Sequence, residues 1–154
     1  MEGNIMDGDT VSVEKVIPAA PEDIFALLSD AQQHSQFDGS GTVVGSKGNS
    51  EPLTLGSKFG MSMKMGIPYS TVNTVIEFES NRRIAWQTTG LAGLIGGRIW
   101  RYELEPVDGG TLVRETWDLS EDKQRFFLKR GKLPAMTKRN ITRTLDRIAE
   151  AVTA

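Results

Sequence analysis

The segment that follows Pro134 constrains the fold more than any other part of the sequence. Its apolar residues recur at spacings of four, three and four, the period of an α-helix: Ile141, Leu145, Ile148 and Val152. Pro134 suits the first turn of such a helix, because a proline there forgoes no helical hydrogen bond. The sequence therefore predicts one long amphipathic C-terminal helix, and its apolar face needs a second apolar surface to cover.

The preceding part of the chain alternates between apolar and polar residues, as half-buried strands do. Six strands are predicted, at residues 11–17, 59–65, 70–79, 84–88, 98–105 and 112–118. In the third of them the alternation places on one face Val72, Thr74, Ile76 and Phe78. Asp108-Gly109-Gly110 predicts a tight hairpin between the last two strands. Residues 39–48, which are rich in glycine, predict either a further strand or a loop.

Short helices are predicted on both sides of the run of strands. Pro21 suits the first position of a helix, and Glu22 and Asp23 suit the positive end of its dipole. Residues 31–37 predict a second helical turn, and Ser120 can cap a short helix that ends near Gly131. The order of elements predicts an α+β fold, in which a curved antiparallel sheet wraps around the long C-terminal helix.

The chain of 154 residues has the length of one domain with one core, which we expect to span residues 10–154. Residues 1–9 are polar and acidic, and they predict a flexible N-terminal segment without a hydrophobic signal core. No apolar stretch has the length of a membrane span, so we expect a cytoplasmic protein without stable membrane insertion. With no cysteine and one histidine, the chain offers few metal ligands. We expect neither a metal nor a cofactor.

Four stretches resemble the START-like (SRPBCC) superfamily, in particular its polyketide cyclase/dehydrase and lipid-transport branch. They are residues 17–30 (IPAAPEDIFALLSD), 76–86 (IEFESNRRIAW), 102–111 (YELEPVDGGT) and 144–148 (TLDRI). Phe37 stands where the family often has a tryptophan. The resemblance implies a helix-grip fold with a hydrophobic cavity between the sheet and the C-terminal helix. It leaves function open, because family members range from cyclases to carriers that perform no chemistry.

Residues 58–65 predict an unusual inner strand face, on which three methionines follow Phe59 in alternate positions. Methionine is flexible and polarizable, so such a wall can re-pack around ligands of different shapes. The predicted ligand-binding residues are Phe59, Met61, Met63, Trp86, Trp100, Tyr102, Val113, Glu115, Trp117, Met136 and Ile141. This face predicts a binding site for a small hydrophobic molecule, such as a polyketide-like compound or a lipid.

Glu115 is the first candidate for chemistry and Tyr102 the second. If Val113 and Trp117 face inward, Glu115 lies between them, where burial would raise its pKa and suit it to general acid or base catalysis. Two alternatives stay open, because an arginine can pair with this carboxylate, or the strand can face the other way. The arginines considered are Arg98, Arg101 and Arg114.

Two other features give weaker indications of chemistry. His34 lies in a polar run, which predicts a surface or capping role and not catalysis. Residues 39–45 resemble a dinucleotide fingerprint, but the third glycine is one residue late and β-type residues follow where a helix should begin. We therefore reject dinucleotide binding.

Charge and loop composition leave further alternatives. From Glu121 onward nine Lys/Arg residues stand against four Asp/Glu residues, which most simply indicates a solvated helix face and no nucleic-acid partner. Residues 90–97 form an apolar, glycine-rich loop that either tucks into the core or gates the cavity. The main hypothesis is a binder of a small hydrophobic molecule. The alternatives are a cyclase or dehydratase-type enzyme, and an interaction protein that uses its basic C-terminal helix against a partner or a membrane.

Overall fold

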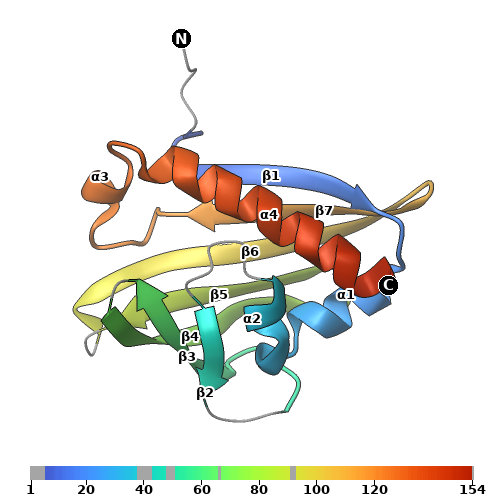
Figure 1. Ribbon diagram of the computed structural model, residues 1–154, viewed down its shortest axis with the longest axis horizontal. Coiled ribbons are helices and arrows are strands. Elements are labelled where there is room, and N and C mark those ends of the chain that lie inside the picture. Colours follow the sequence, from blue (N-terminus) through green and yellow to red (C-terminus); the bar gives the residue numbers. More distant parts are fainter. Residues whose placement is uncertain (1–5, 38–42, 48–50, 66, 91–92, 154) are drawn as a thin grey trace.

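The computed structural model describes residues 6–37, 43–47, 51–65, 67–90 and 93–153. Its elements are β1 Thr10–Ile17, α1 Pro21–Leu28, the 3-10 helix η1 Ala31–Gln33, α2 His34–Phe37, β2 Val43–Lys47, β3 Lys58–Met65, β4 Ile67–Glu79, β5 Arg83–Gly90, β6 Ile95–Val107, β7 Gly110–Asp118, α3 Arg125–Leu128 and α4 Leu133–Thr153. A curved sheet forms one layer, and α4 runs diagonally across it (Figure 1). The predicted α+β helix-grip fold is confirmed.

The strands of the described residues form one antiparallel sheet in the order β1-β7-β6-β5-β4-β3-β2. From β2 to β7 each strand pairs with the next along the chain, as short connections require. Strand β1 pairs with β7, from Thr10 opposite Asp118 to Ile17 opposite Thr111. All six predicted strands are present. A strand or a loop was predicted for residues 39–48. Val43–Lys47 form β2, and the other residues of this segment lie outside the described part.

Strand β4 corrects a prediction of side-chain direction. Its register with β5 shifts between Val75 and Glu77, which marks a β-bulge. Val75 is buried, whereas Val72 is half exposed and Phe78 packs against the core. Because an extra residue reverses the alternation beyond it, Val72 and Phe78 lie on opposite faces. The prediction that Val72, Thr74, Ile76 and Phe78 share a face is wrong.

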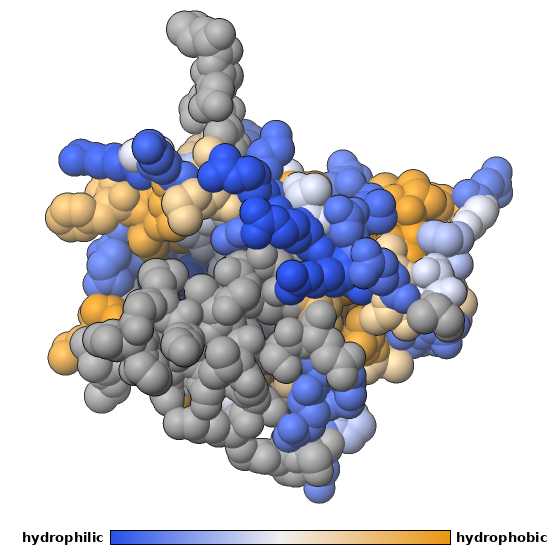
Figure 2. Space-filling model, in the orientation of Figure 1, coloured by the Kyte–Doolittle hydropathy of each residue, from blue (hydrophilic) through white to orange (hydrophobic). Residues whose placement is uncertain are grey.

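Helix α4 covers one face of the sheet, which we call the inner face. It packs on β1 and β7 and contacts α1 and α2. Its buried residues follow the predicted stripe: Pro134, Thr137, Ile141, Thr144, Leu145 and Ile148. The opposite side of α4 is strongly hydrophilic and forms a band across the view in Figure 2. The predicted amphipathic helix is confirmed, and it closes the core against the sheet.

Contacts with the rest of the fold begin before residue 10. Met6 is buried in the core, and Asp7 forms an isolated bridge with Thr10. The Asp9 carboxylate lies 2.8 Å from the Lys129 ammonium. Residues 6–9 therefore pack against the domain, which differs from the predicted flexible segment 1–9. Residues 1–5 lie outside the described part.

Candidate functional site

A row of tryptophans crosses the inner face where β5, β6 and β7 lie side by side. The register places Trp86 opposite Trp100, and Trp100 opposite Trp117. The rings of Trp100 and Trp117 have centroids 6.3 Å apart. Trp86 and Trp117 are buried, and Trp100 is partly buried against the core. The alternation along each strand thus collects the three large rings on the side that α4 covers.

His34 extends this aromatic row from α2. Its ring stacks on Trp86 with centroids 4.7 Å apart, and it meets Phe37 and Phe59 edge-on. Its Nε2 lies 2.9 Å from the carbonyl oxygen of Leu28. A carbonyl only accepts, so Nε2 carries a hydrogen and donates it to the last residue of α1. The side chain is 3% exposed, so a surface role is wrong. The bond to Leu28 is the capping role that the sequence left as the other possibility.

Tyr102 and Glu115, the two candidates for chemistry, are opposite each other on β6 and β7. Each is 3% exposed. The ring of Tyr102 lies 5.5 Å from that of Trp86, which joins the pair to the aromatic row. Val113 and Trp117, which flank Glu115 at alternate positions of β7, are also buried. The strand is therefore not reversed, and Glu115 points inward.

The three arginines considered as partners of Glu115 all bind other carboxylates. Their contacts are Arg98 with Asp122 at 3.1 Å, Arg101 with Glu77 at 2.7 Å, and Arg114 with Glu14 at 3.2 Å. Arg101 and Arg114 belong to alternate positions that face away from α4. Glu115 lies between Val113 and Trp117 on the inner face, and its charge is not taken up by any of these three guanidinium groups.

The remaining predicted ligand-binding residues fall into three groups. Phe59, Val113 and Ile141 are buried on the inner face or on α4. Met136 is 45% exposed, because it lies off the helical stripe that runs through Thr137 and Ile141. Its predicted inward position is wrong. The side chains of two further residues, Met61 and Met63, lie outside the described part of the structure.

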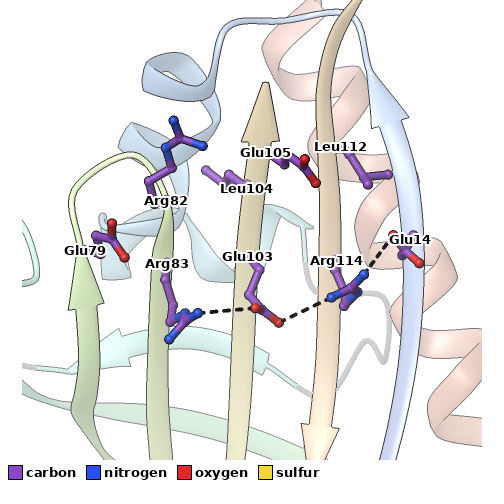
Figure 3. Close-up of a pocket in the computed structure, with 9 residues that line it drawn as sticks. All are labelled: Glu14, Glu79, Arg82, Arg83, Glu103, Leu104, Glu105, Leu112 and Arg114. Atoms are coloured by element: carbon purple, nitrogen blue, oxygen red, sulfur yellow. Dashed lines mark hydrogen bonds and ion pairs between the residues drawn. The ribbon is translucent and has the colours of Figure 1, made fainter. Parts of the chain in front are cut away.

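An open cleft of about 380 Å³ lies on the opposite, outer face, and the sequence analysis did not predict it. Ion pairs cross the strands there, joining Arg83 to Glu103 at 3.6 Å, Glu103 to Arg114 at 4.0 Å and Arg114 to Glu14 at 3.2 Å (Figure 3). The cleft is lined by Glu14, Glu79, Arg82, Arg83, Glu103, Leu104, Glu105, Leu112 and Arg114. Because most of its lining side chains are charged and paired with one another, the cleft has little apolar surface for an apolar ligand to contact. Its signal in the sequence was the charged residues on the polar side of the alternation.

A second ion-pair cluster on the outer face is centred on Arg101. Its guanidinium donates to both carboxylate oxygens of Glu77 and to Asp118. The hydrogen bonds from Arg101 hold the pKa of Glu77 below its ordinary value, against the opposing effect of burial. The same bonds raise the pKa of Arg101. Both groups therefore stay charged near neutral pH and hold strands together, which does not suit them to proton transfer.

Metal binding and membrane spanning find no support in the part of the chain that the structure describes. No three His, Asp or Glu side chains come together there as a metal ion would require. No helix among these residues is long and apolar enough to cross a membrane.

Comparison with known proteins agrees with this architecture. The sequence profile of the family described as "Polyketide cyclase / dehydrase and lipid transport" matches residues 9–153. The chain belongs to this family. The match runs from the start of β1 to the end of α4, which confirms the resemblance seen in the sequence. The family's description covers both enzymes and lipid carriers, so membership alone does not choose between them.

Proteins similar to this chain in sequence or in fold come from several bacteria. The uncharacterized protein Rv0088 of Mycobacterium tuberculosis is 38% identical over 109 residues, which are 70% of this chain and 45% of that protein. The chain thus spans about half the length of the curated relatives it matches. Protein CV1439 of Chromobacterium violaceum has a TM-score of 0.72 and 16% identity, over 95% of this chain and 98% of its own. Protein NE0264 of Nitrosomonas europaea has a TM-score of 0.72 and 11% identity, over 96% and 97%. Identities this low show the fold alone.

Proposed function

We propose that this family member binds a small hydrophobic molecule, a polyketide-like compound or a lipid, on the aromatic inner face of its sheet. The contact residues in this proposal include Phe59, Trp86, Trp100, Tyr102 and Trp117. Met61 and Met63 of β3 remain predicted further contacts. The family description, with its cyclases and lipid carriers, supports a ligand of this class.

The observation that carries the proposal is the presence of polar groups inside the aromatic row. His34, Tyr102 and Glu115 are each buried on the inner face among its aromatic rings and aliphatic side chains, in addition to Asn73 on β4 and two threonines of α4. Burying a carboxylate costs free energy, and a core built for stability alone gains more from an apolar residue of similar size. A few polar groups placed on an apolar wall are typical of small-molecule sites, where they orient the ligand.

Extraction and probe binding test the proposal together. Mass spectrometry of an organic extract of the purified protein should reveal a copurified hydrophobic compound. A fluorescent fatty acid should bind the wild type and be displaced by that extract. Trp100→Arg should abolish probe binding, because it places a charge among the rings at a position open enough to reach solvent. If neither the wild type nor a folded control binds a displaceable probe, the inner face is packed shut and the proposal fails.

Val72→Arg is the matched control for Trp100→Arg. Both substitutions add an arginine to a central part of the sheet, but Val72 lies on the outer face, where it is half exposed. The control should therefore bind the probe as the wild type does. Thermal unfolding of both variants shows whether either has lost its fold. A loss of probe binding in Val72→Arg as well would contradict the placement of the ligand on the inner face.

A second candidate function, an enzyme of cyclase or dehydratase type, is favoured by the pairing of Tyr102 with Glu115. The carboxylate of Glu115 would remove the proton on the carbon next to a ligand carbonyl, and the Tyr102 hydroxyl would donate a hydrogen bond to the developing enolate oxygen. In a β-hydroxy ketone the proton now held by Glu115 would pass to the hydroxyl, which would leave as water while the enolate collapses to a carbon–carbon double bond conjugated with the carbonyl. Both steps need the two groups side by side on one face of the sheet, and Tyr102 and Glu115 are opposite each other on neighbouring strands.

Glu115→Gln separates the enzyme from the carrier. It keeps the shape of the side chain and removes the base, so an enzyme should lose turnover of an aryl β-hydroxy ketone while it still binds the fatty-acid probe. Glu103→Gln, on the outer face of the neighbouring strand, should leave turnover unchanged. Equal turnover in the wild type and Glu115→Gln would show that Glu115 takes no part in catalysis.

A further inference from the structure

Two groups of apolar side chains are exposed at one end of the molecule. Phe126 and Phe127 of α3 are 64% and 79% exposed, and Leu94 and Ile95, at the start of β6, are exposed as well. Figure 2 shows apolar surface at the same end, over α3 and over the turn that leads into β6. Leu128, the last residue of α3, packs against the core instead. Helix α3 is thus anchored by one side chain while two phenylalanines project from it.

Hydrogen bonds join the two groups into one unit. The Lys123 amide donates to the carbonyl of Gly96 at 2.9 Å, and the Gly96 amide donates to the side chain of Gln124 at 2.8 Å. The Lys123 ammonium also donates to the carbonyl of Gly93. Any side chain at Gly97, whose φ is +110°, would collide with the backbone carbonyl of Glu121. The segment before α3 therefore lies directly against the start of β6.

The charge around the exposed phenylalanines is mainly positive. Residues 123–132 contain five basic residues and no acidic one. Two of the nearby acids are engaged, since Asp122 is fully buried against Arg98 at 3.1 Å and Asp9 binds Lys129 at 2.8 Å, whereas Glu121 is exposed. The surface formed by Leu94, Ile95, Phe126, Phe127, Arg130 and Lys132, which we call the α3 patch, therefore combines two exposed apolar areas with basic residues at the same end of the molecule.

We propose that the α3 patch docks on an anionic phospholipid bilayer, with Phe126 and Phe127 entering the headgroup region. Surface-bound proteins combine aromatic residues on one side with Lys and Arg on the other, and clusters of four or more basic residues attract anionic lipids. A protein partner fits less well, because lysine is depleted in protein interfaces and three of the five basic residues in 123–132 are lysines. The inference concerns peripheral docking and does not rest on the proposed ligand.

Vesicle co-sedimentation with the whole chain tests the proposal. The wild type should bind vesicles of phosphatidylcholine that contain about 30% phosphatidylserine. Its affinity for vesicles of pure phosphatidylcholine should be lower by about tenfold or more. Binding should weaken as salt rises, since exposed charges are screened. The variants Phe126→Ser with Phe127→Ser, and Arg130→Glu with Lys132→Glu, should each reduce binding about tenfold or more. Equal binding to both vesicle types would overturn the proposal.

Two controls make the test specific to the α3 patch. Lys138→Glu with Arg139→Glu reverses two exposed charges on α4 and should leave vesicle binding within about threefold of the wild type. If this double variant reduces vesicle binding as much as Arg130→Glu with Lys132→Glu does, α4 contacts the membrane and the proposal for the α3 patch is wrong. Val107→Ser removes an exposed apolar residue from another strand end, and it should have no effect.

Sedimentation velocity and fluorescence distinguish membrane docking from dimer formation through the α3 patch and from a loss of stability in the variant. If the serine pair turns a dimer into a monomer and leaves vesicle binding unchanged, a second copy covers the α3 patch and the proposal is wrong. If the serine pair lowers the thermal stability, Phe127→Trp replaces it. Compared with the wild type, its added emission should shift to the blue on anionic vesicles and be quenched by brominated lipid. An added emission that neither shifts nor is quenched would overturn the proposal.

Discussion

Arg101 makes more charged hydrogen bonds than any other described residue of the outer face. It reaches Glu77 at 2.7 Å and Asp118 at 3.3 Å, and its side chain is only 20% exposed. Charged hydrogen bonds with so little access to water are stronger than ordinary surface pairs. We expect Arg101→Met to lower the free energy of unfolding at pH 7 by about 1–3 kcal/mol, as measured by urea denaturation.

The effect of Arg101→Met should depend on pH in a defined direction. Arg101 lowers the pKa of Glu77 in the folded state, so the stabilisation is complete above the ordinary value of 4.5 and is lost as pH falls through the lowered value. The difference between wild type and variant should be constant from pH 7 to pH 5 and shrink below pH 4.5. A difference that does not change with pH would show that packing of the Arg101 stem, and not its charge, stabilises the sheet.

Arg114→Met is the control for Arg101→Met. Arg114 also bridges neighbouring strands on the outer face, but its side chain is 44% exposed and that of Glu14 is 46% exposed. Pairs this open to water contribute about 0.5 kcal/mol. A loss as large as that in Arg101→Met would mean that exposure does not decide the strength of these pairs.

Single residues also show what the sequence could and could not predict about the inner face. The alternation placed Glu115 on the same face as Val113 and Trp117, and the sequence left open which way that face points until the structure showed both neighbours buried. His34 was not predicted to be buried, because its neighbours along the chain are polar. Its burial comes from Trp86 and Phe59, which only the folded sheet brings against α2. The functional roles of Glu115 and Tyr102 stay predictions.

At the scale of elements, periodicity predicted the strands well and failed where the period itself breaks. The bulge between Val75 and Glu77 in β4 adds a residue that no composition rule reveals, so every side chain beyond it changes face. The prediction for Met136 was wrong for a related reason. The residue is apolar, but it does not belong to the buried stripe of α4. The exposure of Phe126 and Phe127 was also hidden from the sequence, because two phenylalanines in a short helix suggest burial.

The turn between β6 and β7 yields a prediction for adjacent glycines. Both have positive φ, +86° at Gly109 and +150° at Gly110, but a Cβ at Gly109 meets open space. A Cβ at Gly110 would collide with the carbonyl of Ile17 and lie 2.8 Å from the Cα of Pro18. We expect Gly109→Ala to cost about 1 kcal/mol and Gly110→Ala about 3 kcal/mol or more.

Thermal or urea unfolding of the two alanine variants measures this difference. The cost at Gly109 comes from backbone conformation alone, whereas the cost at Gly110 adds the displacement of the chain where β1 meets α1. The hairpin predicted from Asp108-Gly109-Gly110 therefore fixes the end of β1 as well as the turn. Equal costs at both positions would show that the edge of the sheet yields to accommodate the added methyl group.

At the scale of the whole molecule, the two proposals use separate surfaces. The aromatic row lies on the inner face, whereas the α3 patch lies at the end of the molecule where β6 begins. Trp100 is five residues from Ile95 along β6, which corresponds to about 15 Å. Sites separated by more than about 10 Å with no shared partners usually act additively. The segment before α3 is held by hydrogen bonds between the backbone of Gly96 and both the Lys123 amide and the Gln124 side chain. These bonds do not involve the rings of the aromatic row.

Ligand binding should be visible as a gain in stability of the whole chain. A probe at a hundred times its dissociation constant, bound only by the native state, adds about 2.7 kcal/mol to the free energy of unfolding. For a domain of this size the gain should raise the Tm by about 5–10 °C. Scanning calorimetry of the wild type with and without the fluorescent fatty acid measures it. Trp100→Arg should show no rise, and Val72→Arg should show the full rise.

The separation of the two surfaces predicts that their variants act independently. Trp100→Arg should abolish probe binding and leave vesicle binding within about twofold of the wild type, and the Phe126→Ser with Phe127→Ser pair should do the reverse. The combined variant should show both losses, because neither substitution changes the contacts that the other surface needs. Probe binding from solution and vesicle co-sedimentation are measured on the same four proteins. If the serine pair also abolishes probe binding, the end of the molecule at α3 is part of the ligand site, and the two surfaces are one.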